Sequence, residues 1–207
     1  MKNNILAGIL GILFLADLIF ISREGWHELR FFTKPLLVPV IAAIYLSTKG
    51  QKTPVNPFFF AGLIFSFLGD TLLLFKWAFL PGLGSFLLAH VLYIISFIRL
   101  KTANRYGYLP FILVYLGFLL YFLHPYLHEM EVPVIVYGIT ISTMAYFSLC
   151  TQNKWLIPGA VLFVVSDSLL AFNLFVSYTA IMEQVVMATY VAAQFFLVRG
   201  IISSRQV

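Results

Sequence analysis

Long apolar segments separated by short polar ones follow one another through the whole sequence. A transmembrane helix needs about 20 mostly apolar residues. Three segments of at least this length contain no Asp, Glu, Lys or Arg, namely residues 77–98, 106–128 and 132–153. Three more contain one acidic residue each: 3–22 with Asp17, 53–75 with Asp70 and 155–182 with Asp167. Two shorter apolar segments, starting near residues 31 and 178, complete the pattern.

This pattern predicts an all-α integral membrane protein that forms a single transmembrane domain over residues 1–207. We expect eight transmembrane helices, at residues 4–22, 32–48, 57–76, 82–99, 107–124, 132–150, 155–175 and 179–199. Asp17 interrupts the first apolar run and no small-x-small cleavage site follows it. The first segment is therefore interpreted as a helix and not as a cleaved signal peptide.

The composition agrees with a protein whose solvent is largely the lipid bilayer. Of the 207 residues, 61% are hydrophobic and 10% are charged, against about 45–50% and about 25% in soluble domains. The single cysteine, Cys150, excludes an internal disulfide and a multi-cysteine metal site. The net charge of +5 is small and no basic run is present, so we expect no nucleic-acid partner.

The distribution of basic residues predicts the orientation in the membrane. Nine of the 13 Lys and Arg residues fall on the side of the N-terminus. The other four fall on the opposite side: Arg23, Arg30, Lys34 and Lys76. Because cytoplasmic loops carry an excess of Lys and Arg, we expect both termini in the cytoplasm, in a multi-pass protein of the cell inner membrane.

A weak internal repeat relates two of the acidic helices. Displacing the sequence by 97 residues aligns residues 62–75 with residues 159–172, and Asp70 then coincides with Asp167. A displacement of four helices preserves their direction, which is compatible with two parallel four-helix repeats. Chance similarity between apolar helices is the alternative, because the first, second, fifth and sixth segments align poorly.

Asp70 and Asp167 are the strongest candidates for a functional site. An Asp at the centre of a transmembrane helix costs about 2.5–3.5 kcal/mol on insertion scales, and such residues mark function more often than not. The alternative is a hydrogen bond to a neighbouring helix that only stabilises the bundle. Further polar residues fall in the same outer half of the predicted bundle, and we expect them to bind substrate or support the site: Asp17, Lys34, His90, Tyr93, Ser166, Glu183 and Tyr190.

Several of these supporting residues also have a purely structural interpretation. A lone His90 on an apolar helix can satisfy a hydrogen bond between helices. Lys34 can extend its ammonium group to the membrane interface. Tyr93 and Tyr190 can serve packing alone.

Metal and cofactor chemistry has little support in the sequence. His124 and His128 have the i, i+4 spacing of a metal-binding pair, but Pro125 and a loop position argue against a fixed pair of ligands. No motif for a nucleotide, haem or flavin is present. We therefore expect neither a metal nor a cofactor.

Four short polar motifs occur in a specific order along the chain. They are Thr33-Lys34-Pro35, Gly69-Asp70, His90-x-x-Tyr93 and Ser166-Asp167-Ser168-Leu169-Leu170. In this order, on eight helices, they resemble the YhhN family, which includes the lysoplasmalogenases. The resemblance extends over nearly the whole chain, to Tyr190 and Gln194. It implies a membrane hydrolase that cleaves the vinyl ether bond of a lysophospholipid, the lysoplasmalogen, to a fatty aldehyde and a glycerophospho-alcohol, with Asp70 and Asp167 as the catalytic pair.

Vinyl ether hydrolysis suits a pair of carboxyl groups. Protonation of the β-carbon gives an oxocarbenium ion, water attacks this ion, and the resulting hemiacetal collapses. One carboxyl must be a general acid and the other a general base or cation stabiliser, as in glycosidases. Burial and the proximity of two carboxyls separate their titrations. We hypothesise Asp70 and Asp167 in these roles without assigning the acid, with His90 or Tyr93 orienting one carboxyl and Lys34 bound to the lipid phosphate.

Three other functions remain compatible with polar groups in a helical bundle. A small-solute or lipid transporter is the main alternative, since parallel repeats with polar residues near the membrane centre suit alternating access. An intramembrane aspartyl protease also uses two aspartates, but Phe67-Leu68 stands where its extra glycine is expected. The third is a purely structural membrane protein. The sequence predicts neither the lipid head group nor the oligomeric state.

Overall fold

A computed structural model describes residues 2–23, 25–47 and 55–204 of the chain. Within these residues the secondary structure is helical throughout, as the all-α class predicts. The α-helices are α1 (Lys2–Ser22), α2 (Arg30–Ser47), α3 (Pro57–Leu72), α4 (Phe79–Ile98), α5 (Leu109–Leu127), α6 (Glu131–Cys150), α7 (Leu156–Phe175) and α8 (Ala180–Ser203). Single 3-10 turns precede four of them: η1 (His27–Leu29), η2 (Lys76–Ala78), η3 (Tyr106–Tyr108) and η4 (His128–Met130).

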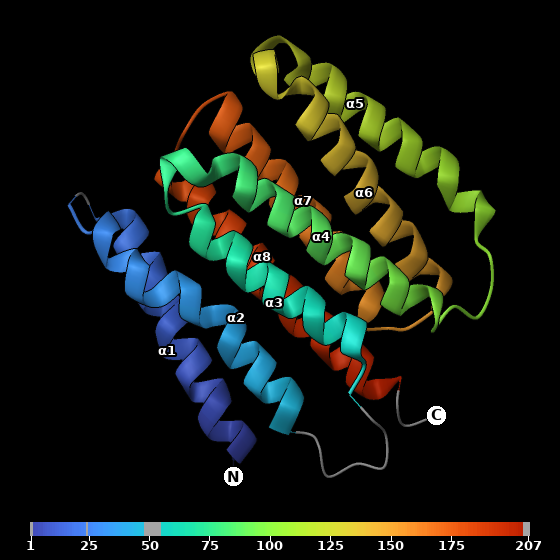
Figure 1. Ribbon diagram of the computed structural model, residues 1–207, viewed down its shortest axis with the longest axis horizontal. Helices are drawn as coiled ribbons and strands as arrows, with labels where there is room; N and C mark the ends of the chain where they lie inside the picture. Colours follow the sequence, from blue (N-terminus) through green and yellow to red (C-terminus); the bar gives the residue numbers. More distant parts are fainter. Residues whose placement is uncertain (1, 24, 48–54, 205–207) are drawn as a thin grey trace.

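The helices form one elongated bundle in which successive helices run in opposite directions (Figure 1). The hairpins α3–α4 and α7–α8 make the most extensive contacts and form the centre of the bundle. The hairpin α1–α2 packs on one side, against α3 and α8, and α5–α6 packs on the other, against α4 and α7. The start of α1 and the end of α8 consequently lie at the same end of the bundle (Figure 1).

Local sequence signals begin the central helices α3 and α8. The side chain of Asn56 accepts hydrogen bonds from the backbone N–H groups of Phe58 and Phe59, at 3.1 Å each, and Pro57 occupies the first helical position. The side chain of Thr179 accepts from the N–H of Met182 at 3.2 Å. Asn and Thr side chains satisfy the free N–H groups of a helix start, and Pro is tolerated there because the N–H that it lacks has no partner within the helix.

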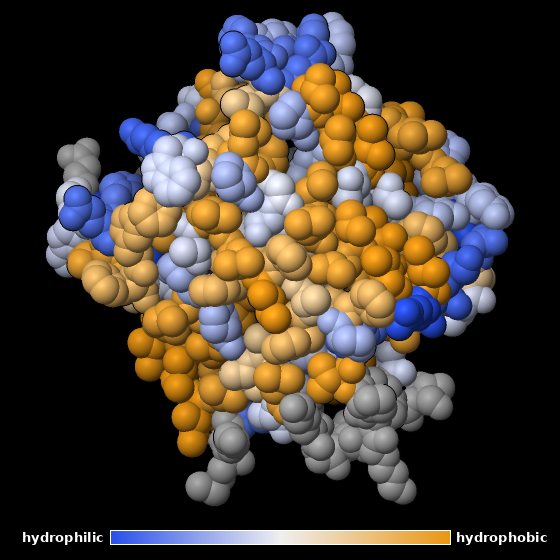
Figure 2. Space-filling view, in the orientation of Figure 1, coloured by the Kyte–Doolittle hydropathy of each residue, from blue (hydrophilic) through white to orange (hydrophobic). Residues whose placement is uncertain are grey.

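The helices are apolar on the outside as well as the inside. Figure 2 shows a broad hydrophobic surface over the middle of the molecule, with hydrophilic residues gathered at its margins. Phe111, for example, is 74% exposed. In the part of the chain that the structure describes, six segments are long and apolar enough to cross a membrane: Asn3–Ser22, His27–Ser47, Lys76–Ile98, Tyr106–Cys150, Leu156–Phe175 and Ala180–Ser203. The chain is therefore a multi-pass membrane protein.

The exact number of eight crossings stays a prediction. The segment Tyr106–Cys150 has 45 residues and contains both α5 and α6. At the same time α3 has only 16 residues, fewer than the roughly 20 of an average transmembrane helix.

Several helix ends differ from those expected: α4 begins at Phe79 and not at residue 82, and α8 ends at Ser203 and not at residue 199. The third helix was expected to reach residue 76, but α3 ends at Leu72, and the N–H groups of Leu74 and Phe75 bond in turns to the carbonyls of Thr71 and Leu72. The apolar run continues through this turn, so hydrophobicity alone does not mark its end. Conversely, α5 continues beyond residue 124, through Pro125, and ends at Leu127, because the proline removes a single N–H donor from the last turn and not the whole helical pattern.

Glycines allow the close approach of the central helices. A Cβ atom on Gly62 of α3 would overlap the ring of Tyr93 of α4. On the other hairpin, a Cβ atom on Gly159 of α7 would lie 3.0 Å from the backbone nitrogen of Leu197 of α8. The interior of the bundle therefore depends on the missing side chain at both positions.

Replacing Gly62 by alanine should destabilise the protein, because the Tyr93 ring must move out of a packed position. We expect Gly62→Ala to lower the free energy of unfolding by about 1–3 kcal/mol. The single cysteine Cys150 is buried, so its reaction with a fluorescent thiol probe on heating in detergent reports the melting temperature. Gly11→Ala is the control, since nothing lies within 4 Å of a Cβ atom there. Equal melting temperatures for both variants would contradict the packing described.

Candidate active site

A cavity lies between α2, α3, α4, α6, α7 and α8, near the end of the bundle opposite the start of α1. Most of its wall is apolar and consists mainly of Leu, Phe and Val side chains. Its polar lining residues are Lys34, Asp70, Tyr137, Ser166, Asp167, Glu183 and Tyr190. An apolar cavity with a few convergent polar groups is the usual form of a small-molecule site.

Asp70 is held near the end of α3. Its side chain is almost completely buried, and its Oδ2 accepts a hydrogen bond of 2.7 Å from the hydroxyl of Tyr190 on α8. Gly69 precedes it, and a Cβ atom at that position would lie 2.5 Å from the ring of Phe86 on α4. The Gly-Asp pair therefore combines close packing of α3 on α4 with a carboxyl that faces the cavity.

The hydrogen bond to Asp70 is the last link of a buried chain. Gln194 donates from Nε2 to the Tyr190 oxygen at 3.4 Å, and Tyr93 donates from its hydroxyl to Gln194 Oε1 at 3.0 Å. The Ser66 hydroxyl lies 3.2 Å from the Tyr93 oxygen. The chain thus connects α3, α4 and α8 and ends at the carboxyl of Asp70.

Asp167 enters the cavity from α7 and has a different environment. Its Oδ2 accepts a hydrogen bond from the hydroxyl of Tyr137 on α6. It lines the cavity and is half-buried, less buried than Asp70. The neighbouring Ser166 donates to the carbonyl of Val186 at 3.0 Å and so fastens α7 to α8.

Lys34 supplies a positive charge to the cavity wall. Its ammonium group has no ion-pair or hydrogen-bond partner among the described residues. It interacts electrostatically at longer range with Asp70 and Glu183. This arrangement leaves its hydrogen-bond donors available to an anionic group of a ligand.

His90 lies behind the cavity in an aromatic environment. Its ring is fully buried and makes edge contacts with Phe163, Tyr137 and Tyr93, at centroid distances of 4.7, 5.3 and 6.4 Å. Neither ring nitrogen makes a hydrogen bond of normal geometry to a described residue, and the weak polar contact of the ring is with the backbone of Phe86. His90 therefore contacts neither carboxyl directly.

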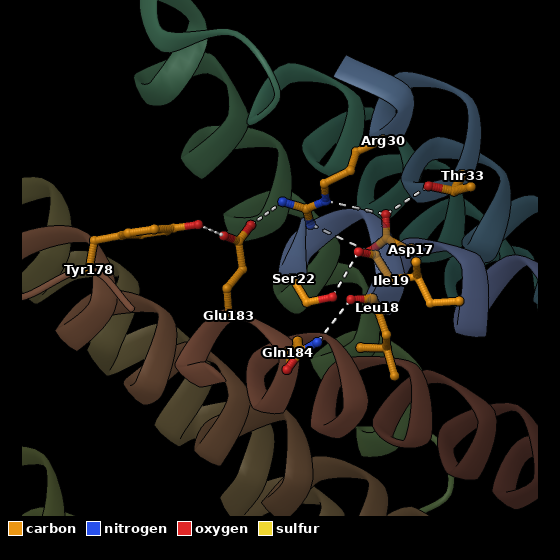
Figure 3. Close-up of polar contacts among 9 residues, drawn as sticks. All are labelled: Asp17, Leu18, Ile19, Ser22, Arg30, Thr33, Tyr178, Glu183 and Gln184. Atoms are coloured by element: carbon orange, nitrogen blue, oxygen red, sulfur yellow. Dashed lines mark hydrogen bonds and ion pairs between the residues drawn. The ribbon is translucent and has the colours of Figure 1, made fainter. Parts of the chain in front are cut away.

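An ion-pair network lies beside the cavity and joins three helices (Figure 3). Arg30 of α2 is buried and donates to both carboxylate oxygens of Asp17 on α1, at 3.3 and 3.4 Å, and to Glu183 on α8. The hydroxyl of Thr33 also donates to Asp17, at 2.8 Å. Tyr178, in the connection before α8, donates to Glu183 at 2.7 Å.

The network keeps its outer hydrogen bond over the physiological pH range. Burial, and then the hydrogen bond to Glu183, raise the pKa of Tyr178 to about 12. The phenol therefore remains protonated near neutral pH and continues to donate to Glu183. Gln184, the next residue on α8, donates to the carbonyl of Leu18 on α1 at 2.9 Å and reinforces the same junction (Figure 3).

The cavity brings together six of the residues expected from the sequence: Lys34, Asp70, Ser166, Asp167, Glu183 and Tyr190. Three others are not part of its lining: Asp17, which pairs with Arg30, His90, which packs among rings, and Tyr93, which reaches Asp70 only through Gln194 and Tyr190. The contacts to the two carboxyls come instead from Tyr190 and Tyr137.

The fold and the site define a multi-pass helical membrane protein with a pair of carboxyl groups in one interior cavity. Residues 29–201 match the YhhN family, and the chain belongs to this family, as its motifs predict.

Relatives with assigned names cover most of the chain. The lysoplasmalogenase TMEM86B of Rattus norvegicus is 35% identical over 180 residues, which are 85% of this chain and 73% of the relative. TMEM86B of Mus musculus is 30% identical over 86% of this chain and 76% of its own length. The lysoplasmalogenase of Mycobacterium tuberculosis is 30% identical over 70% and 60%. No solved structure matches the chain.

Removing the guanidinium group of Arg30 should strongly destabilise the bundle, because two buried carboxylates on α1 and α8 lose their shared partner. We expect Arg30→Met to lower the free energy of unfolding by about 3–5 kcal/mol, measured as a fall in melting temperature with the Cys150 probe. Arg23→Met is the matched control, since the side chain of Arg23 is exposed. If both variants melt at the same temperature, the network does not stabilise the helix junction.

Proposed function

We propose that this protein is a membrane-embedded hydrolase that cleaves the vinyl ether bond of lysoplasmalogens to a fatty aldehyde and a glycerophospho-alcohol. The observation that carries this proposal is the meeting of Asp70 and Asp167, from two separate helix hairpins, in one mostly apolar cavity. The names of the relatives supply the reaction. The apolar wall suits a long alkenyl chain, and the two carboxyls suit the acid and base steps of its hydrolysis.

The carboxyls act on the reacting atoms without a metal or a cofactor in this mechanism. One carboxyl protonates the β-carbon of the vinyl ether, and the other stabilises the oxocarbenium ion and activates the attacking water. The hydroxyl groups of Tyr190 and Tyr137 donate hydrogen bonds to the two carboxyls and orient them before the substrate binds. Such preorganisation lowers the barrier because no rearrangement is needed at the moment of charge development.

We propose that Lys34 binds the phosphate of the lipid. This residue lines the cavity and has no ion-pair partner among the described residues, so its ammonium can bind a phosphate oxygen. Asp70 lies near the end of α3 and Lys34 near the start of α2, at one end of the bundle. A lysophospholipid bound in this way has its head group near Lys34, at this end of the bundle, and its alkenyl chain along the apolar wall of the cavity.

In the membrane, we propose that all eight helices cross the bilayer as a single domain over residues 1–207. The excess of basic residues on the side of the membrane where both termini lie favours cytoplasmic termini in the inner membrane. The cavity then opens to the opposite, outer side. In spheroplasts, whose outer membrane is opened, a reporter protein fused to the C-terminus should be protected from added protease, and digestion of the reporter would show that the termini face outward.

Replacing either aspartate by asparagine should abolish the reaction, since the amide can neither donate the proton nor accept one from water. We expect Asp70→Asn and Asp167→Asn each to reduce aldehyde release from a lysoplasmalogen by at least about a hundredfold. The measurement uses purified protein in detergent with unchanged melting temperature. Glu129→Gln makes the same carboxyl-to-amide change at an exposed position and should retain full activity.

Near-full activity in either Asp variant would exclude the carboxyl pair as the catalytic groups. If the folded native protein releases no aldehyde but moves lysophospholipid or a small solute across liposome membranes, the protein is a transporter that uses the same cavity. Both assays use the same preparation, so they distinguish the two functions directly.

Substituting Lys34 should weaken binding of the phosphate and leave the chemical step intact. For Lys34→Met we expect KM for lysoplasmalogen to rise about tenfold or more, because one charge-assisted contact is lost. An alkenyl glycerol without phosphate is the matched substrate. The native protein and the variant should cleave it equally well. An equal loss of activity on both substrates would place Lys34 in catalysis or in folding instead of phosphate binding.

A further inference from the structure

The two cavity carboxyls are held in different ways, and this difference assigns their roles. We propose that Asp70 is the ionised carboxylate and Asp167 the proton donor, with Gln194 as a positioning residue for Asp70. This assignment rests on the proposed function and adds to it the direction in which the proton moves.

The hydrogen bonds on the Asp70 side all point the same way. Tyr93 donates to Gln194 Oε1, Gln194 Nε2 donates to the Tyr190 oxygen, and Tyr190 donates to Asp70 Oδ2. Because the Tyr93 hydrogen is used on Gln194, the Ser66 hydroxyl at 3.2 Å is the donor in its contact with Tyr93. Asp70 is therefore the terminal acceptor of the chain, and an ionised carboxylate is the form that accepts best.

Gln194 determines this direction through the two ends of its amide. Its carbonyl can only accept, and it accepts from Tyr93; its amino group can only donate, and it donates to Tyr190. The Tyr190 oxygen is thereby occupied as an acceptor, which leaves its own hydrogen for Asp70. Gln194 is fully buried, so no bulk water replaces these bonds.

A single hydrogen bond leads to Asp167, whereas a series of four leads to Asp70. Tyr137 donates to Asp167 Oδ2, and no described residue donates a hydrogen bond to the Tyr137 hydroxyl in turn. Asp167 lines the cavity and is also the less buried of the two residues. A proton donor must reach the substrate carbon, and the free oxygen of Asp167 is in a position to do so.

The surrounding charges favour the same assignment. Asp70 interacts electrostatically with the positive charges of Lys34 and Arg30, and with the negative charge of Asp17. For Asp167, the charged group among the described residues that acts on it is Asp70 itself, which has the same sign. Two carboxylates in one apolar cavity repel each other, so a single proton is retained by the one that lacks a cation.

The assignment gives a reaction in which every proton returns. Asp167 gives its proton to the β-carbon, whose π electrons form the new C–H bond and leave the oxocarbenium ion. Water attacks this ion and loses a proton to Asp70, which produces the hemiacetal. The Asp167 carboxylate then takes the hemiacetal hydroxyl proton, the C–O bond to glycerol breaks, and Asp70 protonates the leaving alkoxide. One water is consumed, and both aspartates regain their starting forms.

Infrared spectroscopy tests the protonation states without any turnover. A protonated carboxyl has a C=O stretching band that is separate from those of carboxylates and amides and shifts in D₂O. At neutral pH we expect this band in the native protein. We also expect it in Asp70→Asn, because the apolar surroundings of Asp167 still disfavour its ionised form when the like charge is gone. We expect its loss in Asp167→Asn.

The other spectroscopic results overturn the assignment. A band that is lost only in Asp70→Asn reverses the two roles. A band lost in both variants shows a proton shared equally between the carboxyls, and absence of the band from the native protein shows that neither carboxyl holds it. These results stand whether or not aldehyde is released, so failure of the proposed function and failure of the assignment remain distinguishable.

The role of Gln194 is tested by Gln194→Met, which keeps the length of the side chain and removes both hydrogen bonds. We expect kcat for aldehyde release to fall about tenfold while KM stays within about twofold, since a hydrogen bond next to a charge is lost and no substrate contact changes. A second protonated carboxyl band should also appear, because Tyr190, the donor to Asp70, loses the contact with Gln194 that orients its hydroxyl.

Gln184→Met is the matched control on the same helix. Gln184 donates to the carbonyl of Leu18 outside the cavity, so its loss should affect melting temperature but neither kcat nor the infrared bands. If Gln194→Met behaves like Gln184→Met, the hydrogen-bonded series through Gln194 has a structural role only and does not position Asp70.

Discussion

Placing two carboxyl groups inside an apolar bundle is the constraint on which the rest of this structure depends. Each Asp in the centre of a membrane helix opposes insertion by about 2.5–3.5 kcal/mol unless a partner compensates. Asp70 and Asp167 each obtain a tyrosine hydroxyl from a neighbouring helix, Tyr190 on α8 and Tyr137 on α6. The packing of α3 on α4 and of α7 on α8, with glycines at the closest contacts, and of α6 on α7 brings the hydroxyls within reach.

A second group of buried charges stabilises the same end of the bundle in a different way. Arg30 satisfies Asp17 and Glu183 together and so links α1, α2 and α8 (Figure 3). Glu183 also belongs to the cavity wall, four residues before the lining residue Met187. The charges that hold the helices together are thus paired, whereas Lys34 is left without a direct partner among the described residues. That contrast separates the paired charges from the one that we propose to bind the lipid phosphate.

Much of the architecture could be predicted because it follows from hydrophobicity. The helices lie within a few residues of the apolar segments. Of the three aspartates that interrupt those segments, Asp70 and Asp167 face one cavity and Asp17 pairs with Arg30. The motif order was enough to identify the YhhN family. The predicted helix ends were wrong where a turn follows Leu72 within an apolar run, and where α5 continues through Pro125 instead of ending before it.

The partners of the carboxyls could not be predicted in the same way. Tyr137 and Gln194 lie on apolar helices where a tyrosine or a glutamine has no distinctive spacing, and only the packing of α6 and α8 reveals their contacts. Arg30 counted merely as one of the basic residues that indicate orientation, although it lies one helical turn before Lys34. His90 was predicted to support the site because it falls with the other polar residues in the outer half of the bundle, yet its contacts are aromatic rings.

Carboxyl-catalysed vinyl ether hydrolysis is tested most directly by the position of the hydrogen that the enzyme adds. Lysoplasmalogen is cleaved in D₂O by the purified protein, and the fatty aldehyde is trapped and analysed by mass spectrometry. Protonation of the vinyl ether by a cavity carboxyl predicts one deuterium on the carbon next to the aldehyde group, together with an unlabelled alcohol oxygen when the reaction is run in H₂¹⁸O. An aldehyde without deuterium at that carbon, or ¹⁸O in the glycerol product, would contradict carboxyl-catalysed vinyl ether hydrolysis.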